Sequence, residues 1–317
     1  MKIALPLLVV ALWLAGCASR LPIDESAFLA PTAVDVRAPV TTPTPIHPMA
    51  RLTPTSRPRP PPADPSPDPS VSPTATPTLG PAVVFLDPGH GGVDTGTIGT
   101  TADGTVVDEK TVALAIALRT ALALRHDGLG VVLSRSDDSL PGSTSSDYTS
   151  DGTELTPDGV LADLQRRIDR ANGSGARVLL SIHLNAFDDP SIGGAETFYD
   201  SSRPFSARSL RFATLVQETL IDRLRAAGYD TPDRGVTDDQ DLAIESLGSL
   251  AGDYHHLVLL GPGVSGRLRP SQMPGALSEP LFLSNPPEAT AAIQPAMQDL
   301  IANAYARAIE AFLREGG

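Results

Sequence analysis

Val84-Phe85-Leu86-Asp87-Pro88-Gly89-His90-Gly91-Gly92 is the stretch that decides the fold. Its apolar start and the Asp-Pro-Gly turn signal that follows indicate a buried strand that leads into a loop. His90 stands in that loop between glycines, so the backbone can turn sharply and leave the imidazole accessible. Ligands of open α/β sheets bind at the carboxyl ends of strands, which makes this histidine a candidate binding residue.

Strand and helix signals alternate from this stretch to the end of the chain, which predicts an α/β fold. Strands are expected at residues 83–86, 131–133, 178–182 and 195–199. Helices are expected at about 109–125, 161–173, 205–227 and 288–313, the first of them capped by Asp108. We expect one domain, residues 83–317, with a twisted, mostly parallel or mixed central sheet and helices on both faces. Residues 229–273 are rich in Gly and Asp and receive no assignment, and residues 136–156 form a loop that is long for a compact domain.

The charge of this domain excludes one class of partner. Residues 83–317 hold 18 Lys/Arg against 32 Asp/Glu, a net charge of −14. Such a domain repels polyphosphate, so we expect no nucleic-acid partner. The chain has a single cysteine, Cys17, so no intrachain disulfide forms and any metal site must use His and carboxylates.

The first seventeen residues predict an export signal. Lys2 precedes a short apolar run at residues 3–14, followed by Ala15-Gly16, which is the pattern of a secretory signal and is too short to span a bilayer comfortably. An ordinary signal peptide is one interpretation. Leu14-Ala15-Gly16-Cys17 also resembles a bacterial lipobox, which implies lipidation of Cys17 and an extracytoplasmic protein anchored to a membrane.

Residues 18–82 separate this signal from the domain. Seventeen of the 31 prolines lie between Arg20 and Pro81, among Thr, Ser and Ala. Too few residues there could bury apolar area, so we expect a disordered linker. It is either a stalk that gives a tethered domain reach or a spacer without a required length.

Two more residues join His90 as candidate ligands. His183 closes the expected strand at 178–182, and Glu109 lies in the first turn of a helix. Two imidazoles and one carboxylate are a common ligand set for catalytic zinc, with the fourth position open. Spacing alone supports this weakly, since each residue also has a structural explanation: a turn residue (His90), a helix-dipole carboxylate (Glu109) or a core histidine (His183). His126 and the His255-His256 pair are expected on surfaces or in loops.

Several local motifs follow one another across residues 83–317. They comprise residues 84–92 with Asp94 and Gly96, Glu109-Lys110, Leu133-Ser134-Arg135 with Asp138, Arg167, Ala171-Asn172, Ser181 to Ala186, Gly194 to Tyr199, and Leu277 to Pro286. In this order, the motifs together resemble those of the zinc-dependent N-acetylmuramoyl-L-alanine amidases.

The resemblance implies one zinc ion per domain, held by His90, Glu109 and His183, with Glu279 as the catalytic carboxylate. It implies hydrolysis of the amide between N-acetylmuramic acid and the L-alanine of peptidoglycan. In such a site zinc lowers the pKa of water toward about 7. Glu279 would take a proton from water and return it to the leaving amine. Leu281-Phe282-Leu283, interpreted as an apolar strand, would raise the pKa of Glu279.

The chain departs from the family pattern beside this carboxylate. A small residue is expected two positions after Glu279, where this sequence has Leu281, and Pro280 restricts Glu279 to extended conformations. The loops at 136–156 and 229–273 also differ, and either is a candidate cover for the active site that a protein partner would remove. The residues that bind substrate are not identified.

Two other functions remain open from the sequence. One is a zinc carboxypeptidase that acts on stem peptides. The other is a non-catalytic wall-binding or regulatory lipoprotein on the same fold. The four residues His90, Glu109, His183 and Glu279 together favour the amidase.

Overall fold

The computed structural model describes residues 82–242 and 254–317. In these residues the central sheet has the order β4-β1-β5-β8-β6-β7. The bounds of its strands are Gly130–Leu133 (β4), Val83–Pro88 (β1), Val178–Ile182 (β5), Gly275–Glu279 (β8), Ala195–Tyr199 (β6) and Asp233–Asp238 (β7). Strands β4, β1, β5 and β8 run parallel, whereas β6 is antiparallel to β8 and parallel to β7. The predicted mixed, mostly parallel α/β sheet is therefore confirmed.

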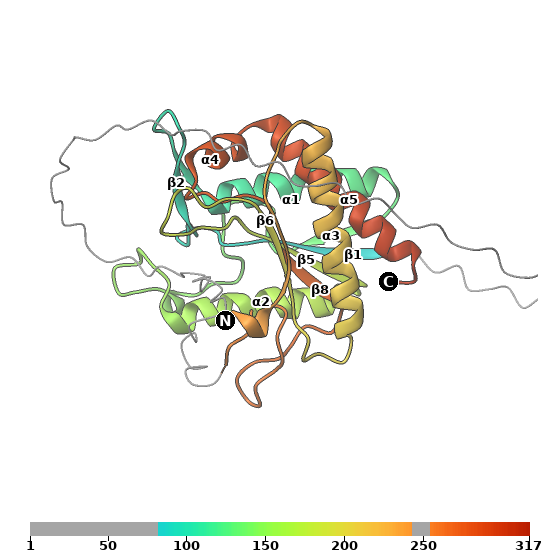
Figure 1. Ribbon diagram of the computed structural model, residues 1–317. Helices are drawn as coiled ribbons and strands as arrows, with labels where there is room; N and C mark the ends of the chain where they lie inside the picture. The colour runs from blue at the N-terminus through green and yellow to red at the C-terminus, as the bar shows by residue number, and fades with distance from the viewer. Residues whose placement is uncertain (1–81, 243–253) are drawn as a thin grey trace, which may run out of the picture. The chain divides into compact units, whose positions relative to one another are not determined.

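Five α-helices surround this sheet in the described part of the chain (Figure 1). They are α1 (Glu109–His126), α2 (Pro157–Gly173), α3 (Ser206–Ala226), α4 (Pro286–Ala292) and α5 (Pro295–Arg314). A two-stranded hairpin, β2 (Ile98–Thr100) with β3 (Val106–Asp108), precedes α1. Asp108 caps α1 as predicted, because its side chain accepts a hydrogen bond from the Thr111 amide.

The helix predicted at 288–313 is wrong as a single element. The structure has α4 and α5 there, separated by Ile293 and Gln294. Pro295 disfavours helical geometry at Gln294, whose ψ of 126° is extended, and then serves as the first residue of α5. Hydrophobic periodicity continues across this break, which is why periodicity alone predicts one helix.

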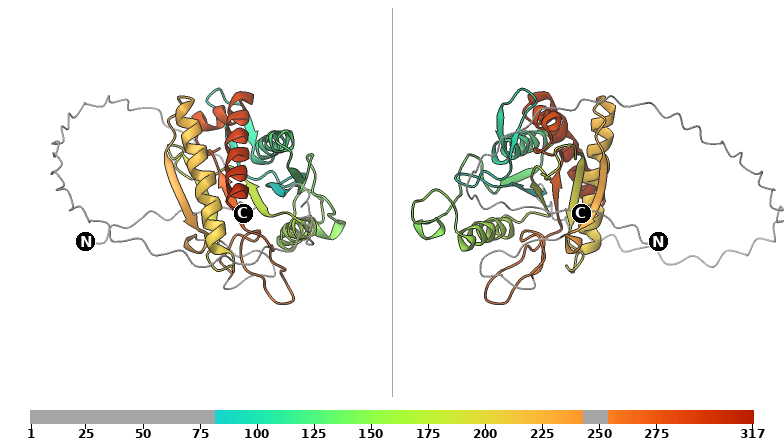
Figure 2. Two further views of the ribbon diagram at one scale, coloured as in Figure 1. Left: turned by 90° about the vertical axis from the view of Figure 1, so that its right-hand side faces the viewer. Right: turned by 60° about the vertical axis from the view of Figure 1, so that its left-hand side comes forward.

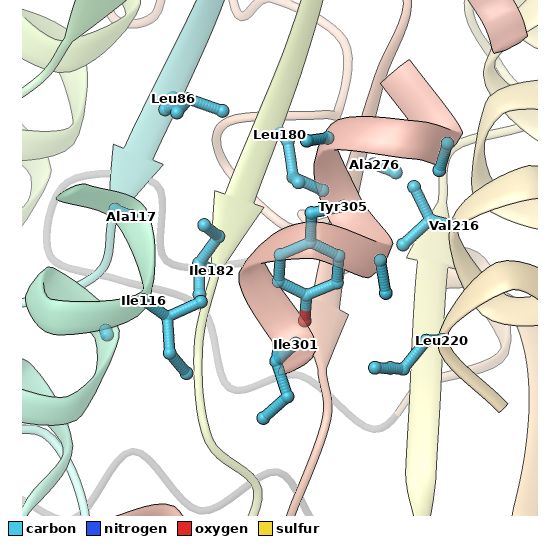
Figure 3. Packing of buried hydrophobic residues seen from close by; sticks show 14 of the residues in the cluster. Leu86, Ile116, Ala117, Leu180, Ile182, Val216, Leu220, Ala276, Ile301 and Tyr305 are labelled. Atoms are coloured by element: carbon cyan, nitrogen blue, oxygen red, sulfur yellow. The ribbon is translucent and has the colours of Figure 1, made fainter. Parts of the chain in front are cut away.

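Helices α1, α3 and α5 cover one face of the sheet, and α3 and α5 lie side by side (Figure 2). Tyr305 and Ile301 of α5 pack between Val216 and Leu220 of α3 and the apolar side chains of the central strands (Figure 3). Burial of this continuous apolar layer is the main stabilising contribution, at about 25 cal/mol per Å² of apolar surface removed from water.

The other face is covered by α2 and by an irregular segment, residues 254–273. Phe85 and Leu179 of the sheet pack there against Ile168 of α2 and against Leu259 and Leu260 of the segment. The part of residues 229–273 that the structure describes therefore contributes to the core. The loop at 136–156 includes the 3-10 turn η1 (Ser145–Asp147), which packs against α2.

Residues 1–81 lie outside the described residues, and with them the predicted signal, Cys17 and nearly all of the predicted linker. Of the helices in the described part, none has the length and apolar character that crossing a membrane requires.

Candidate metal centre

The predicted site residues meet at one edge of the sheet. His90 lies two residues beyond β1, His183 directly follows β5, and Glu279 is the last residue of β8. Because β1, β5 and β8 are parallel neighbours, their carboxyl ends lie at the same edge. Glu109 reaches this edge as the first residue of α1.

His90, Glu109 and His183 form a close triangle. Glu109 Oε1 lies 3.1 Å from His90 Nε2 and 2.9 Å from His183 Nδ1. The imidazole rings face each other edge to face, with centroids 4.9 Å apart. One potential ligand atom of each residue lies within 4.8 Å of the others, so a single ion can contact all three.

The hydrogen bonds around the triangle orient its ligand atoms. Both carboxylate oxygens of Asp94 lie 2.9 Å from His90 Nδ1, which leaves Nε2 directed at Glu109. The amides of Thr97 and Leu184 donate to the two oxygens of Glu109, at 2.9 and 3.0 Å. A carboxylate behind a ligating imidazole is the usual outer partner in zinc sites. The two imidazoles and the Glu109 carboxylate, with the Asp94 carboxylate behind His90, therefore fit a zinc site.

Glycines provide the space for this arrangement. A Cβ on Gly89 would lie 2.3 Å from His183 Cε1, and one on Gly96 would lie 2.5 Å from His90 Cδ2. His90 itself has a φ of 60°, which is rare for a residue with a side chain. The motif around His90 therefore serves two purposes, a left-handed turn and close packing of the imidazoles.

Two buried arginines support the strained loop. Arg167 donates from Nη2 to the His90 carbonyl (2.7 Å) and from Nη1 to Asp87 Oδ1 (2.9 Å). Arg135 donates from Nη2 to the Gly89 carbonyl at 2.7 Å. A strained backbone conformation persists only where several contacts hold it in place, and these hydrogen bonds do so for His90. The sequence contains both arginines in the family motifs but gives no sign of this role.

The charges of the site favour a cation. Burial opposes a charged imidazole, but the carboxylates of Glu109 and Asp94 raise the pKa of His90 to about 10. Burial would raise the pKa of Glu109, yet His90 and the hydrogen bond from His183 hold that pKa well below its ordinary value. Two carboxylates thus create a negative potential around the imidazoles, as a metal site requires.

Glu279 lies beside the triangle and is buried. It is 7% exposed, and its Oε2 atom is buried without a hydrogen-bond partner among the described residues. Burial raises the pKa of Glu279 well above its ordinary value, and the charges of Glu109 and Glu196 raise it further. Arg234 does not neutralise it directly, because its Nε binds Glu196 Oε2 at 3.1 Å. Such a carboxyl is suited to hold and release a proton.

The strand next to Glu279 differs from the prediction. The paired strand is Gly275–Glu279, before the apolar run, and residues 281–283 follow it as an irregular stretch with one bridge between Phe282 and Asn185. Pro280 has no amide proton for the ladder, so regular pairing ends there. Leu281, Phe282 and Leu283 are nonetheless fully buried.

Comparison with known proteins identifies the family. A model of the N-acetylmuramoyl-L-alanine amidase family matches residues 84–311. The chain belongs to this family. It is a peptidoglycan amidase, and its α/β fold matches those of solved amidases.

Individual relatives agree with this assignment. The amidase is 30% identical over 235 residues to the germination-specific N-acetylmuramoyl-L-alanine amidase of Bacillus subtilis, covering 74% of this chain and 81% of that protein. It is 32% identical to LytC of the same organism over 70% of this chain, which corresponds to 33% of LytC. The CwlD amidase of Clostridioides difficile, solved in complex with the GerS lipoprotein, has 28% identity and a TM-score of 0.53 and covers 74% of this chain and 98% of that one.

The other histidines of the amidase have different environments. His126 ends α1 with an exposed side chain, as predicted. His256 does lie in an irregular segment, but its side chain is mostly buried against Asp200 and Asp239. No pattern in the sequence connects these three residues, which come from separate segments.

Proposed function

We propose that the amidase is zinc-dependent, with His90, Glu109 and His183 as the metal ligands and Glu279 as the catalytic carboxylate. The observation that carries the proposal is the convergence of two imidazole nitrogens on Glu109 Oε1, at 2.9 and 3.1 Å. When bound, zinc supplies Lewis-acid chemistry, since it polarises the scissile carbonyl and lowers the pKa of water.

Side chains and backbone amides of the protein position the ligand residues and transfer the proton. Asp94 holds the His90 ring, and the amides of Thr97 and Leu184 hold the Glu109 carboxylate. Glu279 takes the proton of the attacking water on Oε2, which has no hydrogen-bond partner among the described residues. It then returns this proton to the departing amine of L-alanine. Burial and the charges of Glu109 and Glu196 keep the pKa of this carboxyl high enough for the second transfer.

We infer that the N-terminal segments direct this activity out of the cytoplasm. Residues 1–17 are then a lipoprotein signal, Cys17 carries the lipid, and residues 18–82 are a Pro-rich linker. Two or three acyl chains give stable anchoring. A domain with a net charge of −14 gains little attraction from an anionic wall, so tethering supplies the local concentration.

Product analysis with and without metal tests the activity. The full-length chain is incubated with purified sacculi and the released fragments are identified by mass spectrometry. We expect intact stem peptides with an L-alanine N-terminus, none after treatment with a chelator, and recovery on addition of Zn²⁺. Shortened stem peptides would instead indicate a carboxypeptidase, and full activity in chelator would refute zinc dependence.

Lipid labelling tests the anchor. Cells expressing the chain are grown with a labelled fatty acid, and we expect label on the wild type and none on Cys17→Ala. Label that persists in the variant would contradict lipidation at Cys17.

A further inference from the structure

A second group of metal-ligand residues lies at the other end of the sheet. Asp200 directly follows β6, Asp239 opens the 3-10 turn η2 (Asp239–Asp241) after β7, and His256 belongs to the irregular segment 254–273. This segment is drawn in orange at the bottom of Figure 1, away from α4 at the top. Together these residues join three stretches that are separate in the sequence.

Strand pairing shows that this cluster is distinct from the zinc candidate. Strand β6 runs antiparallel to β8, so Asp200 continues toward the start of β8 while His183 follows the end of the parallel β5. The register places Asp200 four residues from the level of His183, or about 13 Å along the strands. No ion could be shared between the two clusters.

The geometry of the second cluster is as close as that of the first. His256 Nδ1 lies 2.7 Å from Asp200 Oδ2 and 3.2 Å from Asp239 Oδ1. One potential ligand atom of each residue lies within 4.8 Å of the others, as in the triangle of His90, Glu109 and His183. Ligands at about 2.0–2.2 Å around a tetrahedral ion are about 3.4 Å apart, so only a small opening of either cluster is needed.

A buried oxygen without a hydrogen bond points to a further ligand. Asp200 is 1% exposed, and its Oδ2 has no hydrogen-bond partner in residues 82–242 and 254–317, although His256 Nδ1 is close. Nδ1 of His256 carries at most one proton, so it cannot donate a hydrogen bond to both carboxylates. Its hydrogen-bond partner is Asp239. A buried unsatisfied oxygen of this kind requires an explanation, and an ion is one of the accepted ones.

The charges around Asp200 and Asp239 indicate that this ligand is positively charged. Asp200 and Asp239 are both buried, at 1% and 0% exposure, and within the described residues their only ion pairs are with His256. Arg203 lies nearby, but its Nη atoms donate to the carbonyls of residues 260, 261 and 271. Two buried carboxylates that both remain ionised require a paired cation or a metal, because otherwise one of them takes up a proton.

We propose that Asp200, Asp239 and His256 form a second divalent-cation site that is structural and takes Zn²⁺ or Mn²⁺. One imidazole favours zinc, and two carboxylates favour a harder ion such as manganese. The ion would fasten segment 254–273, which supplies Leu259, Leu260 and other apolar residues to the core, to the ends of β6 and β7. This inference stands independently of the proposed catalytic zinc.

Metal counting on the full-length chain tests the site. The wild type, Asp200→Asn/Asp239→Asn and Glu109→Gln/His183→Ala are each equilibrated with Zn²⁺ or Mn²⁺ and dialysed, and bound metal per chain is measured by mass spectrometry. We expect two equivalents of one of these ions in the wild type and one in each double variant. Asp222→Asn/Asp230→Asn removes the same charge from exposed positions and should retain both.

A second readout keeps the test valid if the aspartate variant fails to fold. Glu109→Gln/His183→Ala retains the second cluster, so its melting temperature should rise when Zn²⁺ or Mn²⁺ replaces the chelator. Failure of this variant to bind either ion, or an aspartate variant that still binds two, would overturn the proposal. Asp200, Asp239 and His256 would then share protons through hydrogen bonds and bind no ion.

Discussion

The two clusters use the same residue types at opposite ends of one sheet, but their surroundings differ. The first has two imidazoles and one carboxylate, and it lies where parallel strands end. The second has two carboxylates and one imidazole, and it lies where the β6–β7 pair ends. The residue types alone therefore do not distinguish the proposed catalytic site from the proposed structural one.

The neighbours of the first cluster support its proposed catalytic role. His90 is held in a strained conformation by Arg167. Glu279 lies beside it with a raised pKa and with an oxygen that has no hydrogen-bond partner among the described residues. Around the second cluster, the neighbouring segment contributes core residues such as Leu259. A strained ligand loop and an adjacent proton carrier indicate turnover, whereas connection of buried segments indicates stabilisation.

The largest expected effect is the loss of activity when a histidine of the first cluster is replaced. His183→Ala should lower kcat/KM on sacculi by about 10³-fold or more, because zinc contributes several kcal/mol to the transition state. One metal equivalent should disappear with the activity. Release of stem peptides by this variant at a rate within tenfold of the wild type would remove His183 from the catalytic ligand set.

Replacement of the proton carrier should have a smaller effect. Glu279→Gln preserves shape but cannot accept a proton, so kcat should fall by about 10²–10⁴-fold while metal content is unchanged. Glu279→Ala should behave alike. Glu218→Gln, an exposed change on α3, serves as the control. Loss of metal from Glu279→Gln would show that the residue is a ligand rather than an acid–base group.

Replacement of Asp94, the carboxylate behind His90, should have a smaller effect on activity than replacement of Glu279. Asp94→Asn weakens the hold on His90 Nδ1, and zinc affinity should fall by about 10–100-fold. Competition with a chromophoric chelator measures this, with the exposed Asp103→Asn as reference. At saturating zinc most activity should return, an outcome that a collapsed fold would not give.

Local patterns predicted the elements that have strong local signals. Asp108 marks the start of α1, and the apolar runs at residues 83–86 and 178–182 give the central strands. Strand β8 was missed, because Gly275 and Ala276 carry little of the apolar signal of a buried strand. Its place between β5 and β6 depends on pairing across the sheet, which no local pattern encodes.

The two clusters show how far sequence reasoning reaches into the sites. Spacing supported His90, Glu109 and His183 only weakly, and the family motifs connected them. Asp200, Asp239 and His256 have no such motif, so only the folded chain brings them together. The bonds of Arg135 and Arg167 to carbonyls of the His90 loop depend likewise on tertiary structure.

The smallest effect on catalysis is expected at the second cluster. Asp200→Asn/Asp239→Asn should change kcat on sacculi by no more than about twofold at temperatures well below unfolding, because separated sites act independently. The same variant should lose its metal-dependent gain in melting temperature. A large fall in kcat in a folded variant would mean that segment 254–273 is coupled to the first cluster, and the distinction between a catalytic end and a structural end of the sheet would fail.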